Sequence, residues 1–553
     1  MKIVEAIVKT LEKLGVEYIF GIPGSQTCPF YDALYSSSIK HILVRHEQSA
    51  AYMADAYAKI TGRPGVCDGT GGPGATNLIT GVATSWTDRT PVIVFTGQQP
   101  LSELGRGAFQ ELDHNAIFAP ITKISIRISN SMNITYIIRE AYRISVEGRP
   151  GPVHIDMPLD VQVADLLVED IDLQPPPHIS ESKIDIEAVR KATSLLASSN
   201  RPLIIAGGGI HYSGIGAWIE VKALAEYMAI PVATTFNGRG SFPEDHPLSA
   251  GRMGVNSASY TDEVASSADT ILAVGCRFAA LSTRRWSIPN PKATLIHVDV
   301  DPSVIGLNYK ATIAIIGDAK TILRYMLEEA SKLSDTGISR RRDWLRFLEE
   351  AKERWRRSEY FSKIYSDNTP LKPQRVCYEI RRIFDRSTIF TLDAGNNKLW
   401  ASTFIEIYEP RTWIQSGCFG PMGYALPAAI SCKLVKPDRI VVAICGDGGF
   451  YMSLHELATS IQEDIPVIVC VFNDGALGTI KHRQTLAYSG RYISVDLSNP
   501  SFAKIADAFG CYGLEAETPI QLRSALDEAL KANRTGETVV VDIRIDGSEL
   551  LPP

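Results

Sequence analysis

Short apolar runs that end at glycine or at small polar residues constrain the fold of this chain more than any other feature. Residues 91–96, 440–445 and 467–472 are runs of this kind and contain almost no polar side chain. Central strands of a parallel sheet have this pattern, because helices cover them on both faces. Segments with apolar residues at helical spacing, such as residues 3–14, alternate with the runs. The sequence therefore predicts an α/β protein with doubly wound parallel sheets.

Two polar stretches indicate where the chain divides into domains. Residues 174–178, Gln-Pro-Pro-Pro-His, can continue neither a helix nor a central strand. Residues 340–363 are dense in charge, which predicts an exposed helix between two domains. We therefore expect three domains, at residues 1–175, 185–335 and 365–553, each built on a doubly wound parallel sheet.

The charge and the cysteine pattern argue against several classes of protein. A formal net charge of −6 over 553 residues gives no electrostatic reason to expect nucleic acid or an anionic membrane as a partner. The sequence shows neither a signal peptide nor a run of about 18 apolar residues, so we expect a cytoplasmic protein that does not enter the membrane. The nine cysteines lack any Cys-x-x-Cys spacing, which favours reduced core residues.

Polar clusters follow two of the apolar runs in the last domain. Residues 446–449, Gly-Asp-Gly-Gly, come after one run, and Asn473 follows the next run, 26 residues after Asp447. Ligands of open parallel sheets bind at the carboxyl ends of the strands, where helix N-termini favour phosphate. Asp447, Asn473 and the carbonyl of Gly475 offer three oxygens to magnesium, which commonly bridges protein oxygens to a diphosphate. Either cluster alone would be an ordinary turn, but together they predict a magnesium site.

These two clusters, in this order and at this spacing, resemble the cofactor motif of thiamine diphosphate (ThDP) enzymes of the acetolactate synthase type. The resemblance extends over essentially the whole chain through six further motifs: His46-Glu47-Gln48, residues 72–77, 109–111, 149–152 and 242–247, and Met422-Gly423-Tyr424. It implies a pyrimidine-binding, a central and a diphosphate-binding domain in chain order, with ThDP and Mg²⁺ as cofactors.

The resemblance also implies roles for the residues that match its motifs. Glu47 would hydrogen-bond the pyrimidine ring and exchange a proton with it. Met422 would hold the two cofactor rings in a bent conformation, and the carbonyl of Gly420 would accept a hydrogen bond from the cofactor's amino group. The other cofactor contacts implied in this way are Pro23, Gly24, Ser25, Asn77, Gly395, Asn396, Asn397, Gly446, Asp447, Gly448, Gly449, Asn473, Gly475, Ala476, Leu477 and Gly478. The alternatives are a solvated Glu47 at a helix start and Met422 as loop filler.

Several residues are expected on the substrate side of the cofactor. By the resemblance, Gln110 is a catalytic residue, and Phe109, Gln26 and Arg483 contact the substrate. His114 could be a local acid or base, but a lone histidine is more often structural, and both interpretations stay open.

The chain departs from the acetolactate synthase pattern where a second substrate would bind. Leu281 replaces an arginine that would hold the carboxylate of the acceptor, and Arg483 replaces a tryptophan that shapes the acceptor pocket. The Gly24-Ser25-Gln26 loop and the Asn396-Asn397 pair differ from the pattern as well. The substrate of the family therefore cannot be transferred to this chain without a test.

The sequence leaves open whether the central domain binds FAD. A strand that runs into glycines at residues 207–209 fits a dinucleotide site, but tight strand-to-helix turns require glycine for steric reasons as well. The resemblance places the stretch that contains Ala279 and Ala280 beside the flavin, and both alanines depart from its pattern. Arg284 or Arg285 could replace the missing arginine only with a shifted register.

The leading hypothesis is ThDP- and Mg²⁺-dependent decarboxylation of a 2-oxo acid, similar to pyruvate, with carboligation to an acceptor. One alternative is a decarboxylase that releases an aldehyde, or a lyase that cleaves a 2-hydroxyacyl thioester. A second is a ThDP-binding protein without catalytic activity. The resemblance implies a homodimer or homotetramer with active sites between subunits, and it allows a small regulatory subunit.

Overall fold

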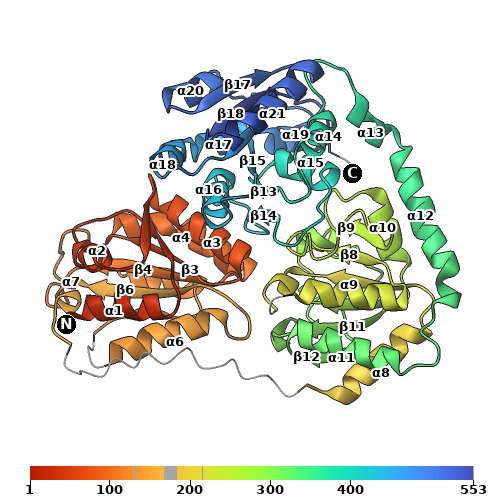
Figure 1. Cartoon of the computed structure of the whole chain (residues 1–553), viewed down its shortest axis with the longest axis horizontal. Coiled ribbons are helices and arrows are strands. Elements are labelled where there is room, and N and C mark those ends of the chain that lie inside the picture. Colours follow the sequence, from red (N-terminus) through yellow and green to blue (C-terminus); the bar gives the residue numbers. More distant parts are fainter. Residues whose placement is uncertain (130–132, 167–183, 214–215, 552–553) are drawn as a thin grey trace.

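Three parallel β-sheets of six strands each organise the chain (Figure 1). The structure is a computed structural model, and it describes residues 1–129, 133–166, 184–213 and 216–551. Helices flank each sheet, so the predicted α/β class with three doubly wound sheets is confirmed. The predicted linker at residues 174–178 lies outside the described residues, and the domain limits drawn from it stay a prediction.

The N-terminal sheet has the strand order β2-β1-β3-β4-β6-β5. Its strands are β1 (Tyr18–Gly21), β2 (Lys40–Leu43), β3 (Gly65–Gly69), β4 (Val92–Gln98), β5 (Ser125–Arg127) and β6 (Val153–Pro158). Alternate residues of β4 pack into two different cores, because successive side chains of a strand point to opposite faces. The helices of one core are α3 (Glu47–Thr61) and α4 (Pro73–Asp88), and those of the other are α1 (Ile3–Lys13), α2 (Cys28–Tyr35) and α6 (Ile134–Val146).

The middle sheet has the order β9-β8-β7-β10-β11-β12, which is the strand order of Rossmann dinucleotide-binding folds. Its strands are β7 (Pro202–Ala206), β8 (Val232–Thr234), β9 (Ser249–Arg252), β10 (Thr270–Val274), β11 (Thr294–Asp299) and β12 (Ile313–Ile316). One face packs against α8 (Ile186–Ser198), α9 (Ala217–Met228) and α11 (Ala319–Ser331), and the other against α10 (Ser259–Ser267) and α12 (Arg342–Arg356).

The C-terminal sheet, β14-β13-β15-β16-β18-β17, repeats the order of the N-terminal sheet. Its strands are β13 (Ile389–Leu392), β14 (Trp413–Gln415), β15 (Val441–Gly446), β16 (Ile468–Asn473), β17 (Tyr512–Ala516) and β18 (Val539–Arg544). One face packs against α14 (Pro373–Ile383), α15 (Asn396–Phe404) and α21 (Pro519–Arg534), and the other against α16 (Ala425–Val435) and α20 (Phe502–Ala508). The apolar runs at 440–445 and 467–472 are β15 and β16, which pair in parallel as predicted.

In each sheet the strands are added in opposite directions from one central pair: β1 and β3, β7 and β10, or β13 and β15. The loops that follow these strands separate there and leave a crevice at the carboxyl edge of the sheet, where α/β proteins bind ligands. The candidate site residues of the N-terminal sheet follow β1 to β4, and those of the C-terminal sheet follow β13 to β16, so the topology brings them to the carboxyl edges of these two sheets.

The charge-dense segment forms α12, but the helix is not fully exposed as predicted. Trp344, Leu348, Ala351 and Trp355 recur at helical spacing and are buried, whereas charged residues occupy the opposite face. The charge density concealed this narrow apolar stripe, which lies against α10 and the middle sheet. Figure 1 shows α12 in green beside the middle sheet, where the chain passes to the C-terminal sheet.

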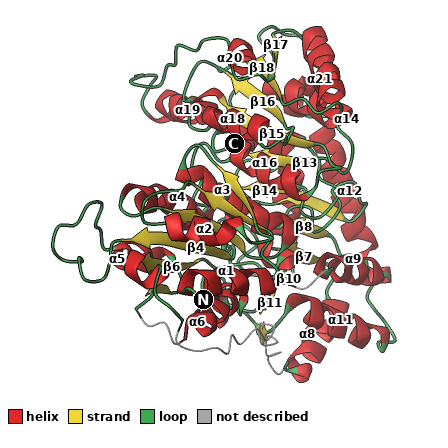
Figure 2. Ribbon diagram, turned by 60° about the vertical axis from the view of Figure 1, so that its left-hand side comes forward, coloured by secondary structure: helices red, strands yellow, loops and turns green. Residues whose placement is uncertain are grey.

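A buried ion network joins α3 and α4 of the N-terminal domain to β14 and to the start of α16 in the C-terminal domain. Lys59, near the end of α3, lies 2.7 Å from Asp55 and 2.8 Å from Asp88, and it donates to the carbonyl of Gln415 at 2.6 Å. Tyr424 donates to the other side of this network, at 2.6 Å from Asp55. Because removing one partner would leave an unpaired buried charge, the network fixes α3 against α16 (Figure 2).

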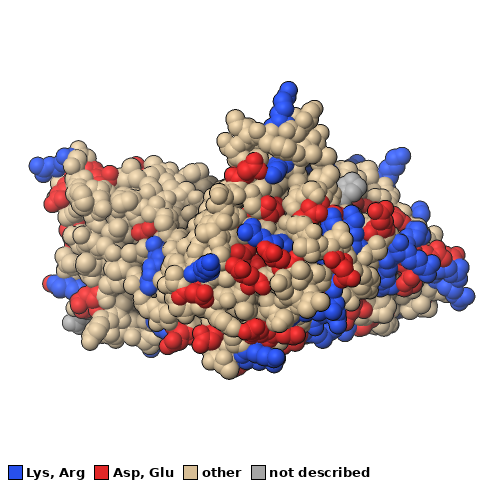
Figure 3. All heavy atoms as spheres, turned by 90° about the horizontal axis from the view of Figure 1, so that it is seen from above, with Lys and Arg blue, Asp and Glu red and all other residues tan. Residues whose placement is uncertain are grey.

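The surface agrees with the modest net charge. On the face seen in Figure 3, basic and acidic side chains are interspersed. In the part of the chain that the structure describes, no helix is both long and apolar enough to span a membrane. All nine cysteines are unpaired; most are buried, and Cys28 is exposed. A cytoplasmic location stays a prediction.

Candidate active site

Glu47 lies buried at the carboxyl edge of the N-terminal sheet. It is the first residue of α3, with only 8% of its surface exposed, and His46 caps the helix by accepting a hydrogen bond from the amide of Gln48. Asn77, in the first turns of α4, donates to Oε2 of Glu47 at 2.9 Å. A Cβ added to Gly74 would lie 3.3 Å from Oε1, so a helix start crowds the second oxygen. The alternative of a solvated Glu47 is therefore excluded.

Gln26 and Gln110 lie in the same crevice as Glu47. Thr70, which follows β3, donates to Oε1 of Gln26 at 2.5 Å, and Nε2 of Gln26 lies 3.1 Å from Oε1 of Gln110. Thr70 also contacts Gly74, so these residues and Glu47 form one continuous group. We call Glu47, Asn77, Thr70, Gln26 and Gln110 the N-terminal group.

The loop of Pro23, Gly24 and Ser25 passes close to the end of β3. A Cβ on Gly24 would lie 2.3 Å from Cβ of Thr70, so only glycine lets the loop of Pro23, Gly24 and Ser25 pass this close to β3. Phe109 has 75% of its surface exposed, so its ring makes no enclosed substrate pocket within a single chain.

His114 occupies a structural position. The histidine is fully buried, its Nε2 accepts a hydrogen bond from the amide of Gly72 at 3.1 Å, and its Nδ1 lies 2.8 Å from Asp156. Both ring nitrogens are thus engaged, and the backbone amide leaves Nε2 without a proton to donate. This geometry supports the structural interpretation of His114, which holds the start of α4 to β6.

Asp447, Asn473 and Gly475 meet at the carboxyl edge of the C-terminal sheet. Nδ2 of Asn499 donates both to Oδ2 of Asp447, at 2.7 Å, and to Oδ1 of Asn473, at 2.9 Å. The carbonyl of Gly475 accepts from the amide of Leu497 at 2.8 Å and keeps its second lone pair. We call Asp447, Asn473, Gly475 and Asn499 the oxygen cluster.

Asp447 and Asp474 have no ion-pair partner in the part of the chain that the structure describes. Burial raises the pKa of Asp447, and burial together with repulsion from Asp447 raises the pKa of Asp474 to about 7. No lysine or arginine among the described residues forms an ion pair with either carboxylate, and Oδ1 of Asn499 is buried without a hydrogen-bond partner. One carboxylate, one amide oxygen and one carbonyl are hard oxygen donors, so the residues present fit a divalent cation.

Neighbouring residues orient the oxygens of the cluster. Nδ2 of Asn473 donates to Asp542 at 2.8 Å, which turns Oδ1 of Asn473 toward Asp447. The guanidinium of Arg544 donates to the same Oδ1 at 3.2 Å. Asn499 and Asp542 could not be identified from the sequence, because both come from loops or strands distant in the chain and neither belongs to the motif.

Two helix starts lie next to the oxygen cluster. Gly395 precedes α15, and Leu477 precedes α19 (Gly478–Ala487); neither helix has a side-chain cap, so the first amides stay available to an anion. Asn396 connects the two starts, because its Oδ1 accepts from Thr479 on α19 at 2.8 Å. A Cβ on Gly478 would lie 2.4 Å from the carboxylate of Asp474, so this position requires glycine.

The loop that carries Met422 is anchored beside the same cluster. Asp393, directly after β13, accepts from the amide of Gly423 at 2.9 Å, and burial raises its pKa to about 6. A Cβ on Gly448 would lie 3.2 Å from Cε of Met422, so this side chain extends over the Gly446–Gly449 turn. Gly420 has a φ of +63°, a conformation that favours glycine. Met422 therefore lies against the turn that carries Asp447, and its role toward the cofactor stays a prediction.

The N-terminal group and the oxygen cluster are separate within one chain. Among the described residues, no hydrogen bond or ion pair connects Glu47 with Asp447, Asn473 or Gly475. One hydrogen bond joins α3 to the Met422 loop, where Tyr52 donates to the carbonyl of Met422 at 3.4 Å.

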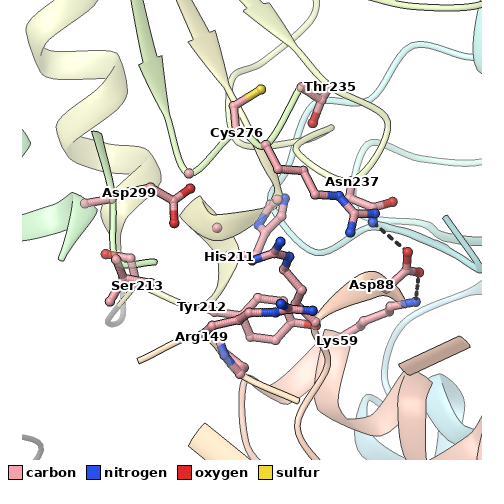
Figure 4. A pocket seen from close by; sticks show the side chains of 18 of the residues that line it. Lys59, Asp88, Arg149, His211, Tyr212, Ser213, Thr235, Asn237, Cys276 and Asp299 are labelled. Carbon is pink, nitrogen blue, oxygen red and sulfur yellow. Dashed lines mark hydrogen bonds and ion pairs between the residues drawn. The ribbon is translucent and has the colours of Figure 1, made fainter. Parts of the chain in front are cut away.

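A cavity of about 290 Å³ lies at the crevice of the middle sheet, and residues from all three parts of the chain line it (Figure 4). Gly208 and Gly209 follow β7, Cys276 follows β10, and Asp299 ends β11 on its wall. Burial raises the pKa of Asp299. Arg149, from the N-terminal part of the chain, and Arg411 add positive charge to the lining. The cavity thus combines a glycine turn, an acid at a strand end and cations, which suits a nucleotide.

The stretch that departs from the family pattern lies beside this cavity. Arg284 forms an ion pair with Asp262, so it is not free to replace the arginine lost at Leu281. Arg284, Arg285 and Trp286 have φ values of +47°, +55° and +63°, a run of left-handed residues that is costly without glycine. Arg483 is exposed on α19 and makes no ion pair with another described residue.

Comparison with known proteins agrees with this geometry. Family models of the thiamine pyrophosphate enzymes match the chain in three parts: the N-terminal TPP binding domain at residues 1–117, the central domain at residues 189–326 and the C-terminal TPP binding domain at residues 393–543. The C-terminal match includes the oxygen cluster, and the N-terminal match includes the N-terminal group.

Three relatives that match nearly the whole chain are named as acetolactate synthase large subunits. The probable acetolactate synthase large subunit of Methanocaldococcus jannaschii is 41% identical over 100% of this chain and 93% of its own length. The acetolactate synthase large subunit of Corynebacterium glutamicum is 37% identical over 97% of this chain and 86% of its own length. Acetolactate synthase isozyme 3 large subunit of Escherichia coli is 35% identical over 99% of this chain and 96% of its own length. The chain therefore belongs to the thiamine diphosphate enzymes of the acetolactate synthase large-subunit family.

Proposed function

We propose that this enzyme holds ThDP through Mg²⁺ and decarboxylates a 2-oxo acid such as pyruvate, passing the remaining unit to a carbonyl acceptor. The observation that carries the proposal is the oxygen cluster beside two uncapped helix starts, in which Asp447 and Asn473 are buried and Asp447 has no ion-pair partner among the described residues. A divalent cation and a diphosphate together would satisfy both the carboxylate and the helix starts.

Residues at the carboxyl edge of the C-terminal sheet would bind the cation and the diphosphate. Asp447, Asn473 and the carbonyl of Gly475 would hold the cation, with Asn499 orienting the two side chains. The first amides of α15 and α19, together with Asn396, would meet the diphosphate. Met422, whose loop Asp393 fixes, would support the bend between the two cofactor rings.

Glu47 would serve as the acid and base of the site. When bound, ThDP supplies a nucleophilic thiazolium carbon and an electron sink for the loss of carbon dioxide. Asn77 donates to Oε2 of Glu47, which leaves Oε1 to hold a proton against the pyrimidine ring nitrogen. Burial of Glu47 excludes water from this proton, and the neighbouring Gln110 would donate a hydrogen bond to an oxygen of the substrate.

A second candidate has no 2-oxo acid as acceptor. Leu281 offers no charge, and Arg284 is already paired with Asp262, so neither position offers a free guanidinium to the carboxylate of a second 2-oxo acid. This observation favours an enzyme that releases an aldehyde or cleaves a 2-hydroxyacyl thioester over one that forms acetolactate.

A product assay with pyruvate separates these candidates. The purified enzyme is incubated with pyruvate, ThDP and Mg²⁺, and carbon dioxide, acetolactate and acetaldehyde are measured. We expect carbon dioxide together with acetolactate. Acetaldehyde in place of acetolactate would support the second candidate, and no carbon dioxide at all would contradict pyruvate as the substrate. Glu47→Gln is the control; we expect it to lower turnover by roughly 10²- to 10⁴-fold without unfolding the chain.

We further propose that the complete site forms between two copies of the chain. The N-terminal group and the oxygen cluster are both at carboxyl edges of their sheets, yet no hydrogen bond or ion pair among the described residues joins them within one chain. A site shared by two copies would bring the Glu47 of one copy to the oxygen cluster of the other. The names of the relatives mention a large subunit, so a small regulatory subunit stays a prediction for this chain.

Mixing two inactive variants tests the shared site. Glu47→Gln and Asp447→Ala chains are unfolded together, refolded and assayed. A mixed dimer contains one site with both substitutions and one site with neither, so we expect activity of up to about a quarter of the wild-type value. Each variant refolded alone is the control and should stay inactive. A mixture that is as inactive as the two controls would place both residues in the same chain's site.

The cavity of the middle sheet offers a second binding site. We infer that it binds a nucleotide cofactor, with Asp299 near the ribose hydroxyls and Arg149 near the phosphates, as the Rossmann strand order favours. FAD belongs to the nucleotides that this cavity suits.

The released ligand of the purified enzyme identifies the occupant. Heat-denatured protein is filtered, and the filtrate is examined by absorbance and mass spectrometry. We expect one nucleotide per chain, and visible flavin absorbance would identify it as FAD. Asp299→Ala should reduce the bound fraction, whereas Asp343→Ala, on the exposed face of α12, should not. A wild-type protein that neither retains nor binds added FAD or ADP would contradict a nucleotide in this cavity.

A further inference from the structure

We propose that Gln26 is a positioning residue that determines which end of the Gln110 amide faces the substrate. The inference rests on the proposed function, in which Gln110 donates to an oxygen of a 2-oxo acid. This role differs from the direct substrate contact that the family resemblance implies for Gln26.

The fold provides a closed slot for Gln26. Its side chain is only 2% exposed and lies between two glycines of neighbouring strand ends. A Cβ on Gly97 would approach the Cβ of Gln26 to 2.8 Å, and one on Gly71 would lie 3.5 Å from its Cδ. Nε2 of Gln162 donates to the carbonyl of Gln26 at 2.7 Å. Backbone and side chain are therefore both fixed, and little of Gln26 can reach a ligand.

Both ends of the Gln26 amide are occupied. Its Oε1 accepts from the hydroxyl of Thr70 at 2.5 Å, and its Nε2 donates to Oε1 of Gln110 at 3.1 Å. A primary amide has one acceptor end and one donor end. Because Gln26 uses the acceptor end of Gln110, the NH₂ group of Gln110 must point the other way.

The outward NH₂ group of Gln110 is available to a ligand. Within the described part of the chain, Nε2 of Gln110 makes no hydrogen bond. A 2-oxo acid presents a keto oxygen and a carboxylate, which are all acceptors, and negative charge grows on the keto oxygen as carbon is attacked. A donor fixed beforehand stabilises such an oxygen better than one that must reorient.

The backbone of Gln110 supports the same conclusion. Its φ is +60°, and its carbonyl oxygen would lie 2.8 Å from a Cβ on Gly72. A left-handed conformation is costly for a residue other than glycine and persists where the surroundings fix it. Gln110 is thus held from two sides, by the glycine beneath its backbone and by Gln26 at the end of its side chain.

Two substitutions at Gln26 separate positioning from packing. Gln26→Met keeps the shape of the side chain but removes both hydrogen bonds, and we expect kcat/KM for pyruvate to fall roughly three- to tenfold, with most of the change in kcat.

In Gln26→Glu, an ionised carboxylate can only accept, so Gln110 would turn its NH₂ inward and present an oxygen to the substrate. Once protonated, the introduced carboxyl group can donate and restores the original orientation, so kcat/KM of this variant should recover toward acidic pH, relative to wild type at each pH.

A double-substitution cycle identifies the residue through which Gln26 acts. If Gln26 acts through Gln110, the Gln26→Met/Gln110→Met pair should be no slower than Gln110→Met alone. Thr70→Val, which removes the donor to Gln26, should shift kinetics in the same direction as Gln26→Met. Gln521→Met, at the exposed start of α21, is the control and should leave kinetics unchanged. Circular dichroism confirms that each variant is folded.

The outcomes are distinguishable. Additive losses in the double variant, or a Gln26→Glu pH profile parallel to that of wild type, would overturn the role of Gln26 and leave the proposed function intact. An unchanged Gln110→Met would overturn the role of Gln110 and this inference with it. A wild-type enzyme that releases no carbon dioxide from pyruvate would instead contradict the proposed substrate.

Discussion

Buried negative charge without a counter-charge is the constraint on which the rest of this structure depends. Asp447 and Asp474 lie at the carboxyl edge of the C-terminal sheet, and no basic side chain in the described part of the chain forms an ion pair with them. Taking a carboxylate out of water is costly unless hydrogen bonds or an opposite charge compensate. The chain supplies hydrogen bonds from Asn499 and from backbone amides, and a bound cation would meet the remaining requirement.

The surrounding elements can be understood from this requirement. The strand order separates the loops after β13 and β15, and the oxygen cluster lies at the crevice between them. Two helices begin beside the crevice without caps, so the same place attracts an anion, and a cation with a diphosphate satisfies both. Asp393 ties the Met422 loop to this edge. The network around Lys59 and Tyr424 then fixes α3, whose first residue is Glu47, against the sheet that holds the cluster.

Much of this architecture could be predicted from the sequence, because local residue patterns determine the strands, the helix starts and the glycine turns. The runs at 440–445 and 467–472 are apolar throughout, so they could only be strands covered on both faces, and parallel pairing then brings Asp447 and Asn473 to the same edge. The helix start at Glu47 and the glycine at position 475, with its φ of +65°, follow from equally local rules.

Contacts between distant loops could not be predicted in this way. Asn499 reaches the oxygen cluster only because the loop before α20 folds over β15 and β16, and no motif marks it. Gln26 was expected to face the substrate, but the close approach of Gly71 and Gly97 encloses it. The sequence leaves the role of His114 open, and only the packed fold places the amide of Gly72 on its ring. Two tryptophans of α12 are buried although charge dominates its composition. Each case depends on tertiary packing rather than on a sequence pattern.

Calorimetric titration with ThDP tests the proposed metal-held cofactor most directly. The wild-type enzyme and the Asp447→Ala variant are each titrated with ThDP in Mg²⁺ and again in excess chelator. We expect Mg²⁺ to tighten binding to the wild type by at least about tenfold and to have little effect on the variant, because the cation needs the carboxylate. Equal affinities for the wild type with and without Mg²⁺ would show that the oxygen cluster does not hold the cofactor through a metal.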